Sequence, residues 1–205
     1  PKVSGKGIKK LKENGVHVEV DILTEECKNH HKIFLTNITK ERPFIILKWA
    51  ETADGYIAPL EKKIAKPVWI SNKYSQQLSH KLRSEFDCIL VGSKTIIDDN
   101  PSLNTRQWQG RSPTVVVLNR KNNLDKNLNI FKTGSEVLII DNKTIDFNKN
   151  ITQQICSFLK SKNFSSIIVE GGAQTLKTFL RENMWDEIKV FKTKNKLANG
   201  INAPT

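Results

Sequence analysis

The sequence predicts an α/β fold in which a sheet carries helices on both faces. Short runs of branched apolar residues, such as 88–91 and 166–169, alternate with segments whose apolar residues recur at helical spacing. The short runs are typical of buried strands, and the 3.6-residue period is typical of surface helices. Because this alternation continues from residue 42 to residue 191, it indicates a single α/β domain.

The amino-acid composition limits the kinds of function that this protein can have. The chain has 205 residues and a formal net charge of +12, with 27 lysines against 6 arginines. The basic residues are scattered, so we interpret the charge as a compositional bias that favours phosphorylated small molecules, with nucleic-acid binding as the alternative. Neither a run of eighteen apolar residues nor a signal-peptide pattern is present, so we expect no membrane contact and a cytoplasmic setting. Three widely spaced cysteines argue against a disulfide framework and against a zinc site.

Residues 1–40 form fewer elements than the rest. Ser4 is placed to cap a helix that Gly15 ends, and alternating valines predict a strand over 16–20. Thr24 is placed to cap a second helix. Its apolar face consists of Cys27, His31, Phe34, Leu35 and Ile38. These elements bury little apolar surface by themselves, so we expect them to dock on a neighbouring domain.

A central strand begins after Pro43. Residues 44–49 are apolar apart from Lys48, which is typical of a strand buried on both faces. Asp54-Gly55 then supplies a tight bend, and extended structure resumes over 56–58.

The next helix is expected over 72–85. Tyr74, Leu78 and Leu82 recur at i, i+4 and i+8, which predicts that they form its buried stripe. Arg83 lies beside that stripe, where its long side chain can reach past the helix edge.

The stretch 88–106 combines a buried strand with polar residues. The strand covers 88–91, and a short helical turn over 95–98 ends before Pro101, which disfavours a helical residue ahead of it. Leu103 and Arg106 follow in an extended segment after this turn.

The second half repeats the alternation. Its expected strands are 114–118, 136–140, 166–169 and 187–191, and its expected helices are 151–163 and 173–182.

Polar residues gather at three strand ends: 48–54, 92–106 and 170–175. Such ends form a crevice at one edge of an α/β sheet. The Glu-Gly-Gly turn at 170–172 lets a backbone approach a pyrophosphate at the following helix N-terminus, although such a turn can also be purely structural. GxGxxG, Walker and GxSxG patterns are all absent from the sequence, so the chemistry is expected to need a cofactor bound in another way.

The chain carries a set of short motifs at and between these strand ends. In order, they are Arg42-Pro43, Lys48-x-Ala50, Asp54-Gly55, Trp69-Ile70, Leu82-Arg83, Val91-Gly92-x-x-Thr95, Asp99-x-Pro101-x-Leu103-x-x-Arg106 and Val169-Glu170-Gly171-Gly172-Ala173. With these motifs, the chain resembles the reductase domain of the bifunctional riboflavin-biosynthesis deaminase/reductase from about residue 40 to residue 191. This resemblance depends on the order and spacing of the motifs as well as on their residues.

The resemblance implies a dihydrofolate-reductase-like domain with a mixed, mostly parallel sheet flanked by helices. It implies that 41–205 is this domain without its final strand or strands, and that 1–40 is the end of a cytidine-deaminase-like domain with its linker. Zinc is then expected only in the deaminase half, and no metal site is expected in this chain.

The implied activity is NADPH-dependent reduction of 5-amino-6-(5-phosphoribosylamino)uracil to its ribityl product. Carried over by resemblance, the NADPH contacts are Ala50, Trp69, Thr95, Asp99, Arg120, Gly172, Ala173, Gln174 and Thr175. The implied substrate contacts are Arg83, Leu103, Arg106 and Glu170. Another pterin or pyrimidine reductase of the same fold is the alternative function, and a homo-oligomer, either a dimer or a tetramer, is expected.

The proton-moving group is expected to be Lys48 or Glu170. Both leave buried strands at the crevice, where desolvation can shift either pKa toward neutrality. A structural ion pair between the two is the alternative interpretation.

Overall fold

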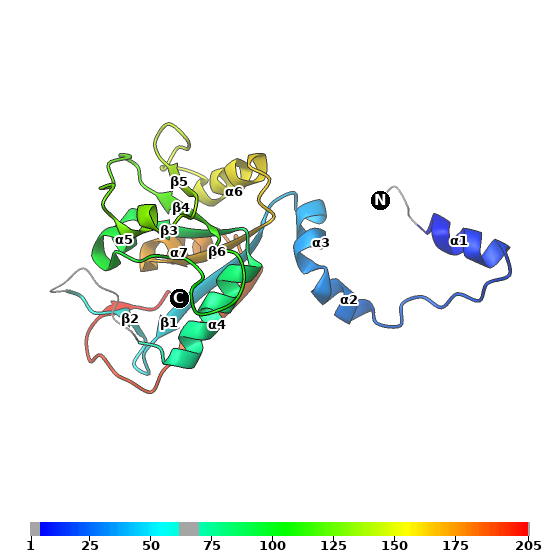
Figure 1. The fold of residues 1–205 in the computed structure, drawn as a ribbon, viewed down its shortest axis with the longest axis horizontal. Coiled ribbons are helices and arrows are strands. Elements are labelled where there is room, and N and C mark those ends of the chain that lie inside the picture. The colour runs from blue at the N-terminus through cyan, green and yellow to red at the C-terminus, as the bar shows by residue number, and fades with distance from the viewer. Residues whose placement is uncertain (1–4, 62–69, 205) are drawn as a thin grey trace.

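A computed structural model describes residues 5–61 and 70–204. Its centre is a six-stranded sheet in the order β5-β4-β3-β6-β1-β7, whose neighbouring strands all pair in parallel (Figure 1). These strands are β1 (Phe44–Glu51), β3 (Cys88–Gly92), β4 (Thr114–Leu118), β5 (Val137–Ile140), β6 (Ser166–Gly171) and β7 (Glu187–Lys192). The short strands β2 (Tyr56–Ala58) and β8 (Ile201–Asn202) form a separate antiparallel pair. The predicted α/β class with a mostly parallel sheet is confirmed.

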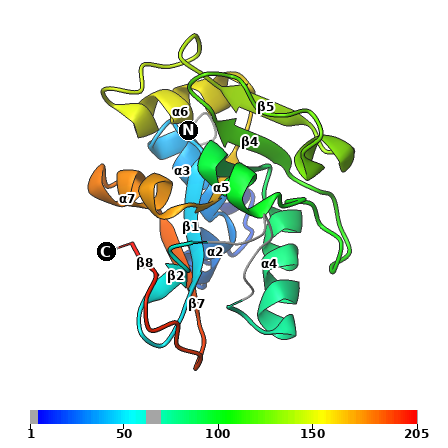
Figure 2. The ribbon, with the colours of Figure 1, turned by 90° about the vertical axis from the view of Figure 1, so that its left-hand side faces the viewer.

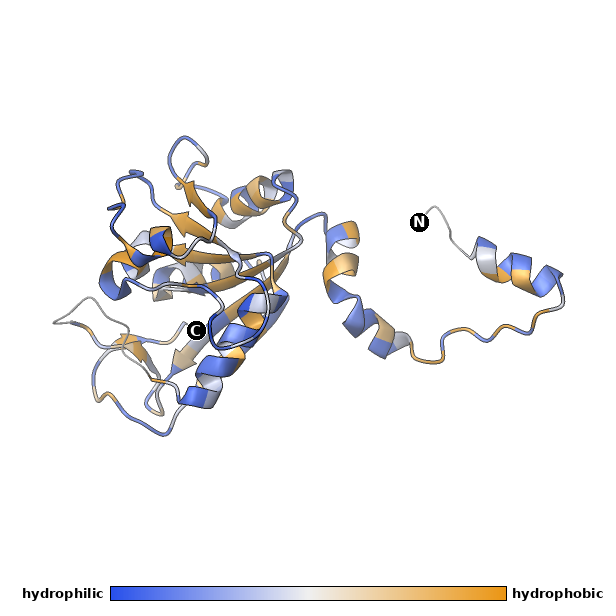
Figure 3. Cartoon of the chain, in the orientation of Figure 1, coloured by the Kyte–Doolittle hydropathy of each residue, from blue (hydrophilic) through white to orange (hydrophobic). Residues whose placement is uncertain are grey.

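Helices cover both faces of the sheet, because successive strand residues point to opposite faces. On one face, Ile45 and Leu90 pack with α6 (Ile151–Ser161) and α7 (Ala173–Arg181). On the other face, α4 (Lys73–Glu85), α5 (Ser93–Asp99) and a 3-10 turn (Asn129–Lys132) pack on the alternate residues. Figure 2 shows these two layers from the side, and Figure 3 shows the apolar strands between them.

Three helices precede the sheet: α1 (Lys6–Glu13), α2 (Thr24–His30) and α3 (Lys32–Thr39). Only α3 docks on the sheet domain, where Ile33 packs against a buried cluster and the Asn37 amide donates to the Ser165 carbonyl at 2.8 Å. Neither α1 nor α2 has a buried residue, and Figure 1 shows both extending away from the sheet.

Two expectations for this region are wrong. Residues 16–20 form no strand, because no partner strand lies beside them in the described part of the chain, and Val16 and Val20 are about half exposed. The single helix expected after Thr24 is broken at His31 into α2 and α3, and Thr24 makes no capping hydrogen bond. The predicted cap at Ser4 lies outside the described residues.

The buried face of α4 also differs from the expected one. Tyr74 is 78% exposed and Leu78 is 53% exposed, so only Leu82 of the expected stripe is buried. The helix instead buries Ser79 and His80 beside Leu82. The apolar spacing was correct for a helix, but the sheet contacts a neighbouring stripe that includes two polar residues.

Candidate active site

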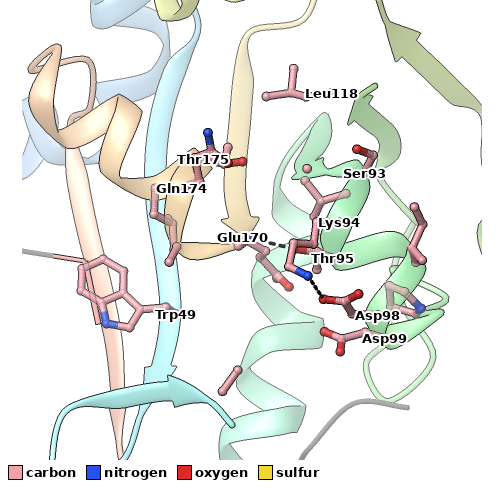
Figure 4. Close-up of a pocket in the computed structure, with 18 of the residues that line it drawn as sticks. Trp49, Ser93, Lys94, Thr95, Asp98, Asp99, Leu118, Glu170, Gln174 and Thr175 are labelled. Atoms are coloured by element: carbon pink, nitrogen blue, oxygen red, sulfur yellow. Dashed lines mark hydrogen bonds and ion pairs between the residues drawn. The ribbon is translucent and has the colours of Figure 1, made fainter. Parts of the chain in front are cut away.

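The carboxyl ends of four adjacent strands open onto one cavity. Because β1, β3, β4 and β6 are parallel, the segments that follow them meet at one edge of the sheet. The cavity there has a volume of about 1280 Å³, whereas typical ligand pockets measure roughly 300–1,000 Å³. Its labelled residues in Figure 4 come from these strand ends and from α5 and α7. The cavity is therefore larger than a typical ligand pocket.

The cavity brings the expected site residues together. Those that line it are Lys48, Ala50, Arg83, Thr95, Asp99, Leu103, Arg106, Arg120, Glu170, Gly172, Ala173, Gln174 and Thr175. Trp69 lies outside the described residues. The individual roles stay predictions, but their shared placement is what a common site requires.

Glu170 lines the cavity and lies at an irregularity in β6. Leu90 of β3 pairs with Val169, yet Val91 pairs with Gly171, so Glu170 is an extra residue with no partner on β3. A bulge of this kind bends a strand and redirects a side chain.

Two cations hold the Glu170 carboxylate. Arg83 donates from Nε at 3.2 Å and from Nη2 at 2.7 Å, one bond to each carboxylate oxygen. Lys48 Nζ lies 3.9 Å from Oε2. The side chains of Lys48, Arg83 and Glu170 are 13%, 12% and 8% exposed, so water screens these charges little.

Burial and charge shift the pKa values of Lys48 and Glu170 differently. Burial alone would raise the pKa of Glu170, but the charges of Arg83 and Lys48 outweigh it and lower this pKa to about 2. Burial lowers the pKa of Lys48, and Arg83 lowers it further, against the opposing charge of Glu170. At neutral pH, Glu170 is therefore ionised, whereas Lys48 loses its proton more easily than an exposed lysine does.

This arrangement predicts an acid-sensitive contribution to stability. The pKa of Glu170 falls from 4.5 to about 2 on folding, so its contribution is complete above pH 4.5 and is lost as the pH falls toward 2. At about 1.4 kcal/mol per pKa unit, this contribution is on the order of 3 kcal/mol. Urea unfolding across this pH window should give a smaller loss of unfolding free energy for Glu170→Gln than for the wild type. Equal losses would contradict the assignment.

Arg106 supplies a second guanidinium. Its Nη1 donates to Asn104 Oδ1 at 2.9 Å, while Arg83 Nη1 donates to the Asn104 carbonyl at 3.3 Å. Burial and the nearby charge of Arg83 lower the pKa of Arg106. Two adjacent guanidinium groups suit an anion with several oxygens, such as a phosphate.

The Gly171-Gly172 turn brings the N-terminus of α7 to the cavity. The Gly172 N–H donates to Thr95 Oγ1 at 2.9 Å, and a Cβ on Gly172, whose φ is +23°, would lie 3.0 Å from that oxygen. No side chain caps α7, and its first turn carries no acidic residue. Because Gly172, Ala173 and Gln174 line the cavity, the free amides of this helix terminus are available to a bound pyrophosphate.

The end of β4 provides a third polar region. Arg120 is exposed, with its guanidinium 5.0 Å from the Phe147 ring centre and its Nη2 donating to the Phe147 carbonyl at 3.3 Å. Asn119 is buried, and its side-chain nitrogen has no hydrogen-bond partner in the described structure.

Several residues of the site region were not expected from the sequence. Trp49, Ser93, Lys94 and Asn119 line the cavity, and each lies beside or within a strand end that the sequence had already indicated. His80 lies behind the cavity, where its Nδ1 accepts the backbone N–H of Arg106 at 3.3 Å. A polar residue three positions before Arg83 on the same helix was the available signal for His80.

Within 5–61 and 70–204, no group of three His, Cys, Asp or Glu side chains is arranged to hold a metal ion. Over the same ranges, no helix has the length and apolar character needed to cross a membrane.

Comparisons with known proteins agree with this architecture. Residues 43–193 match the family model of the RibD C-terminal domain. The riboflavin biosynthesis protein RibD of Aquifex aeolicus is 33% identical over 98% of this chain and 60% of its own length. A RibD from Synechocystis is also 33% identical, over 72% of this chain and 40% of its own length. The chain thus spans about 60% or less of these curated relatives.

Solved structures are similar as well. A diaminohydroxyphosphoribosylaminopyrimidine deaminase/5-amino-6-(5-phosphoribosylamino)uracil reductase from Thermotoga maritima superposes with a TM-score of 0.83 at 30% identity, over 98% of this chain and 59% of that one. The Saccharomyces cerevisiae riboflavin biosynthesis reductase Rib7 shares the fold, with a TM-score of 0.57 at 21% identity over 86% of this chain and 88% of its own.

Proposed function

The chain belongs to the RibD C-terminal domain family, and we propose that it reduces 5-amino-6-(5-phosphoribosylamino)uracil to 5-amino-6-(5-phosphoribitylamino)uracil in riboflavin biosynthesis. Family membership implies a nicotinamide cofactor, and we propose NADPH. The observation that carries the proposal is the single cavity that holds the Lys48, Arg83 and Glu170 cluster beside the uncapped N-terminus of α7.

The proposed cofactor would occupy the α7 side of the cavity. The residues present fit a dinucleotide, because Gly172, Ala173 and Gln174 line the cavity and the free amides of α7 suit a pyrophosphate. When bound, NADPH supplies the hydride that reduces the sugar carbon C1′.

The proposed substrate would lie against α4 and the loop that carries Arg106. Arg83 and Arg106 would bind its 5′-phosphate, since neighbouring guanidinium groups match phosphate oxygens. Lys48, Arg83 and Arg106 carry three positive charges against the one carboxylate of Glu170, and a phosphate dianion would balance the excess.

Lys48 is the better candidate for the proton-moving group. Opening the ribose breaks the C1′–O4′ bond, leaves a C1′=N bond to the amine nitrogen and places a proton on O4′. Lys48 can supply this proton because its pKa is lowered, whereas Glu170 stays ionised. Glu170 would instead stabilise the positive charge that develops at C1′ and nitrogen.

Arg120 is proposed to select NADPH over NADH. Its position at the end of β4 places an exposed permanent cation on the cavity wall, where the 2′-phosphate of NADPH would provide a charged partner. Losing such a contact costs roughly 1.5–3 kcal/mol, so Arg120→Ala should reduce NADPH affinity by about 10- to 150-fold and leave NADH affinity unchanged. Fluorescence titration of both cofactors measures this. An unchanged preference would assign the 2′-phosphate to another residue, such as Lys121.

A direct assay tests the proposed function. The purified chain is mixed with NADPH and the phosphoribosylamino-pyrimidine, and nicotinamide absorbance is followed over time. Substrate-dependent oxidation of NADPH with formation of the ribityl product is expected. Oxidation with dihydrofolate alone would favour the pterin alternative.

The remaining expectations are proposals of the same kind. We propose that 1–40 is the end of a deaminase domain and its linker, with any zinc held in the deaminase half. The homo-oligomer and the cytoplasmic setting stay predictions.

A further inference from the structure

We infer that His80 is a positioning residue that fixes Arg106 in the orientation needed to bind the substrate phosphate. The inference rests on the proposed function and deepens it. His80 is buried, with 2% of the residue exposed, and its Nδ1 accepts the backbone N–H of Arg106 at 3.3 Å.

The helix geometry couples this contact to the other phosphate-binding arginine. His80 and Arg83 are three residues apart on α4, so their side chains project from the same face. Arg83 donates to the Asn104 carbonyl while His80 accepts from Arg106, and one helix thereby holds the loop at two points two residues apart. The backbone that carries the second guanidinium is therefore held on the same helix that carries the first.

The loop needs such restraint because its backbone is unusual. Leu103 has a φ of +53° and Asn100 a φ of +40°, and the left-handed region is sparsely populated by a residue such as leucine. Contacts on both sides impose this conformation: Leu103 is buried in an apolar cluster, and Asn100 accepts from the Asn129 N–H at 2.8 Å. Without the acceptor at His80, the Arg106 end of the loop would lose its anchor on α4.

His80 is suited to this role because it can stay uncharged. Burial together with the charges of Arg83 and Arg106 lowers the pKa of His80 to about 4. The neutral ring keeps Nδ1 free to accept, with its proton on Nε2. A lysine or arginine here would donate rather than accept and would add a third cation beside the two guanidinium groups.

Matched variants test the inference. His80→Asn keeps an acceptor near the Nδ1 position, whereas His80→Leu has the same branched arrangement of four side-chain heavy atoms as Asn and has no acceptor. His80→Phe also lacks the acceptor but keeps a planar aromatic ring, so it provides the test if His80→Leu does not fold. Melting temperature and NADPH affinity establish that each variant is folded.

We expect the substrate KM of His80→Leu to rise by roughly tenfold or more, with kcat and the KM for NADPH within about twofold of the wild type. His80→Asn should stay within about threefold of the wild-type substrate KM, and Arg106→Ala should raise the substrate KM at least as far as His80→Leu does. Equal changes in the KM values for substrate and NADPH, or an Asn variant as impaired as the Leu variant, would overturn the inference.

A binding measurement separates this inference from the proposed function. Calorimetric titration with ribose 5-phosphate probes the anion site without any turnover, and its Kd should rise about tenfold in His80→Leu. If the wild type binds the sugar phosphate but oxidises no NADPH, the proposed function fails while the role of His80 is still decided by the titration. A wild type that binds no sugar phosphate would overturn the inference, since Arg106 would then have no phosphate to bind.

Discussion

Replacing Lys48 with Met should lower the single-turnover rate by roughly 10²- to 10⁴-fold, the usual contribution of a positioned acid or base. The Lys48 side chain is 13% exposed within β1, and its Nζ lies 3.9 Å from Glu170 Oε2. Its lowered pKa favours release of a proton inside the cavity. Stopped-flow measurement of NADPH absorbance with enzyme in excess gives the rate of the chemical step.

The Lys48→Arg variant distinguishes a role of Lys48 in proton transfer from a role of its positive charge alone. Arginine keeps the positive charge beside Glu170 but does not release its proton at accessible pH. We expect the Arg variant to be impaired nearly as strongly as the Met variant. Near-wild-type turnover in Lys48→Arg would mean that the positive charge alone is required, and the proton would then have to come from another group.

Replacing Glu170 with Gln should also lower turnover by roughly 10²- to 10⁴-fold. Gln keeps the shape of the side chain but removes the negative charge between Arg83 and Lys48, so the charge that develops at the sugar would no longer be stabilised. NADPH affinity should change little, because the α7 amides remain. Single-turnover rate, NADPH affinity and melting temperature are measured on the same preparation.

Asp186 provides a matched control for Glu170. Its carboxylate also receives two bonds from one arginine, Arg42, at 2.6 and 2.9 Å, and its side chain is 6% exposed. It precedes β7, at the edge of the sheet opposite the cavity. Asp186→Asn should lower the melting temperature without changing the rate per folded molecule. If Glu170→Gln behaved in the same way, the pair with Arg83 would be purely structural.

The strands of the sheet domain could be predicted closely from the sequence, because their cores are continuous apolar runs. Residues 88–91 and 114–118 illustrate this, since each became a strand of nearly the predicted extent. The strand expected over 16–20 was wrong because alternation is a local pattern, whereas a strand requires a partner strand beside it. Helix faces were less certain, because Leu82 and its polar neighbours were buried by a contact that the spacing alone did not specify.

The location of the site could be predicted from the sequence, but the contacts between its side chains could not. Polar residues at the ends of parallel strands had to meet, so the common cavity of Lys48, Thr95 and Glu170 follows from the topology. The bulge at Glu170 depends on pairing between β3 and β6, which lie far apart in the sequence. The contact from His80 to Arg106 likewise requires knowledge of where the loop returns to α4.

The strand order has a consequence for the way this chain folds. β1 is formed from residues 44–51, yet both of its neighbours, β6 and β7, come from residues 166–192. During synthesis, β3, β4 and β5 can pair with one another as soon as they emerge, whereas β1 must wait unpaired for more than a hundred residues. Such long-range parallel pairing slows folding and leaves an apolar strand open to wrong partners. We therefore expect this domain to be prone to aggregation during synthesis, while β1 is exposed and has no partner strand.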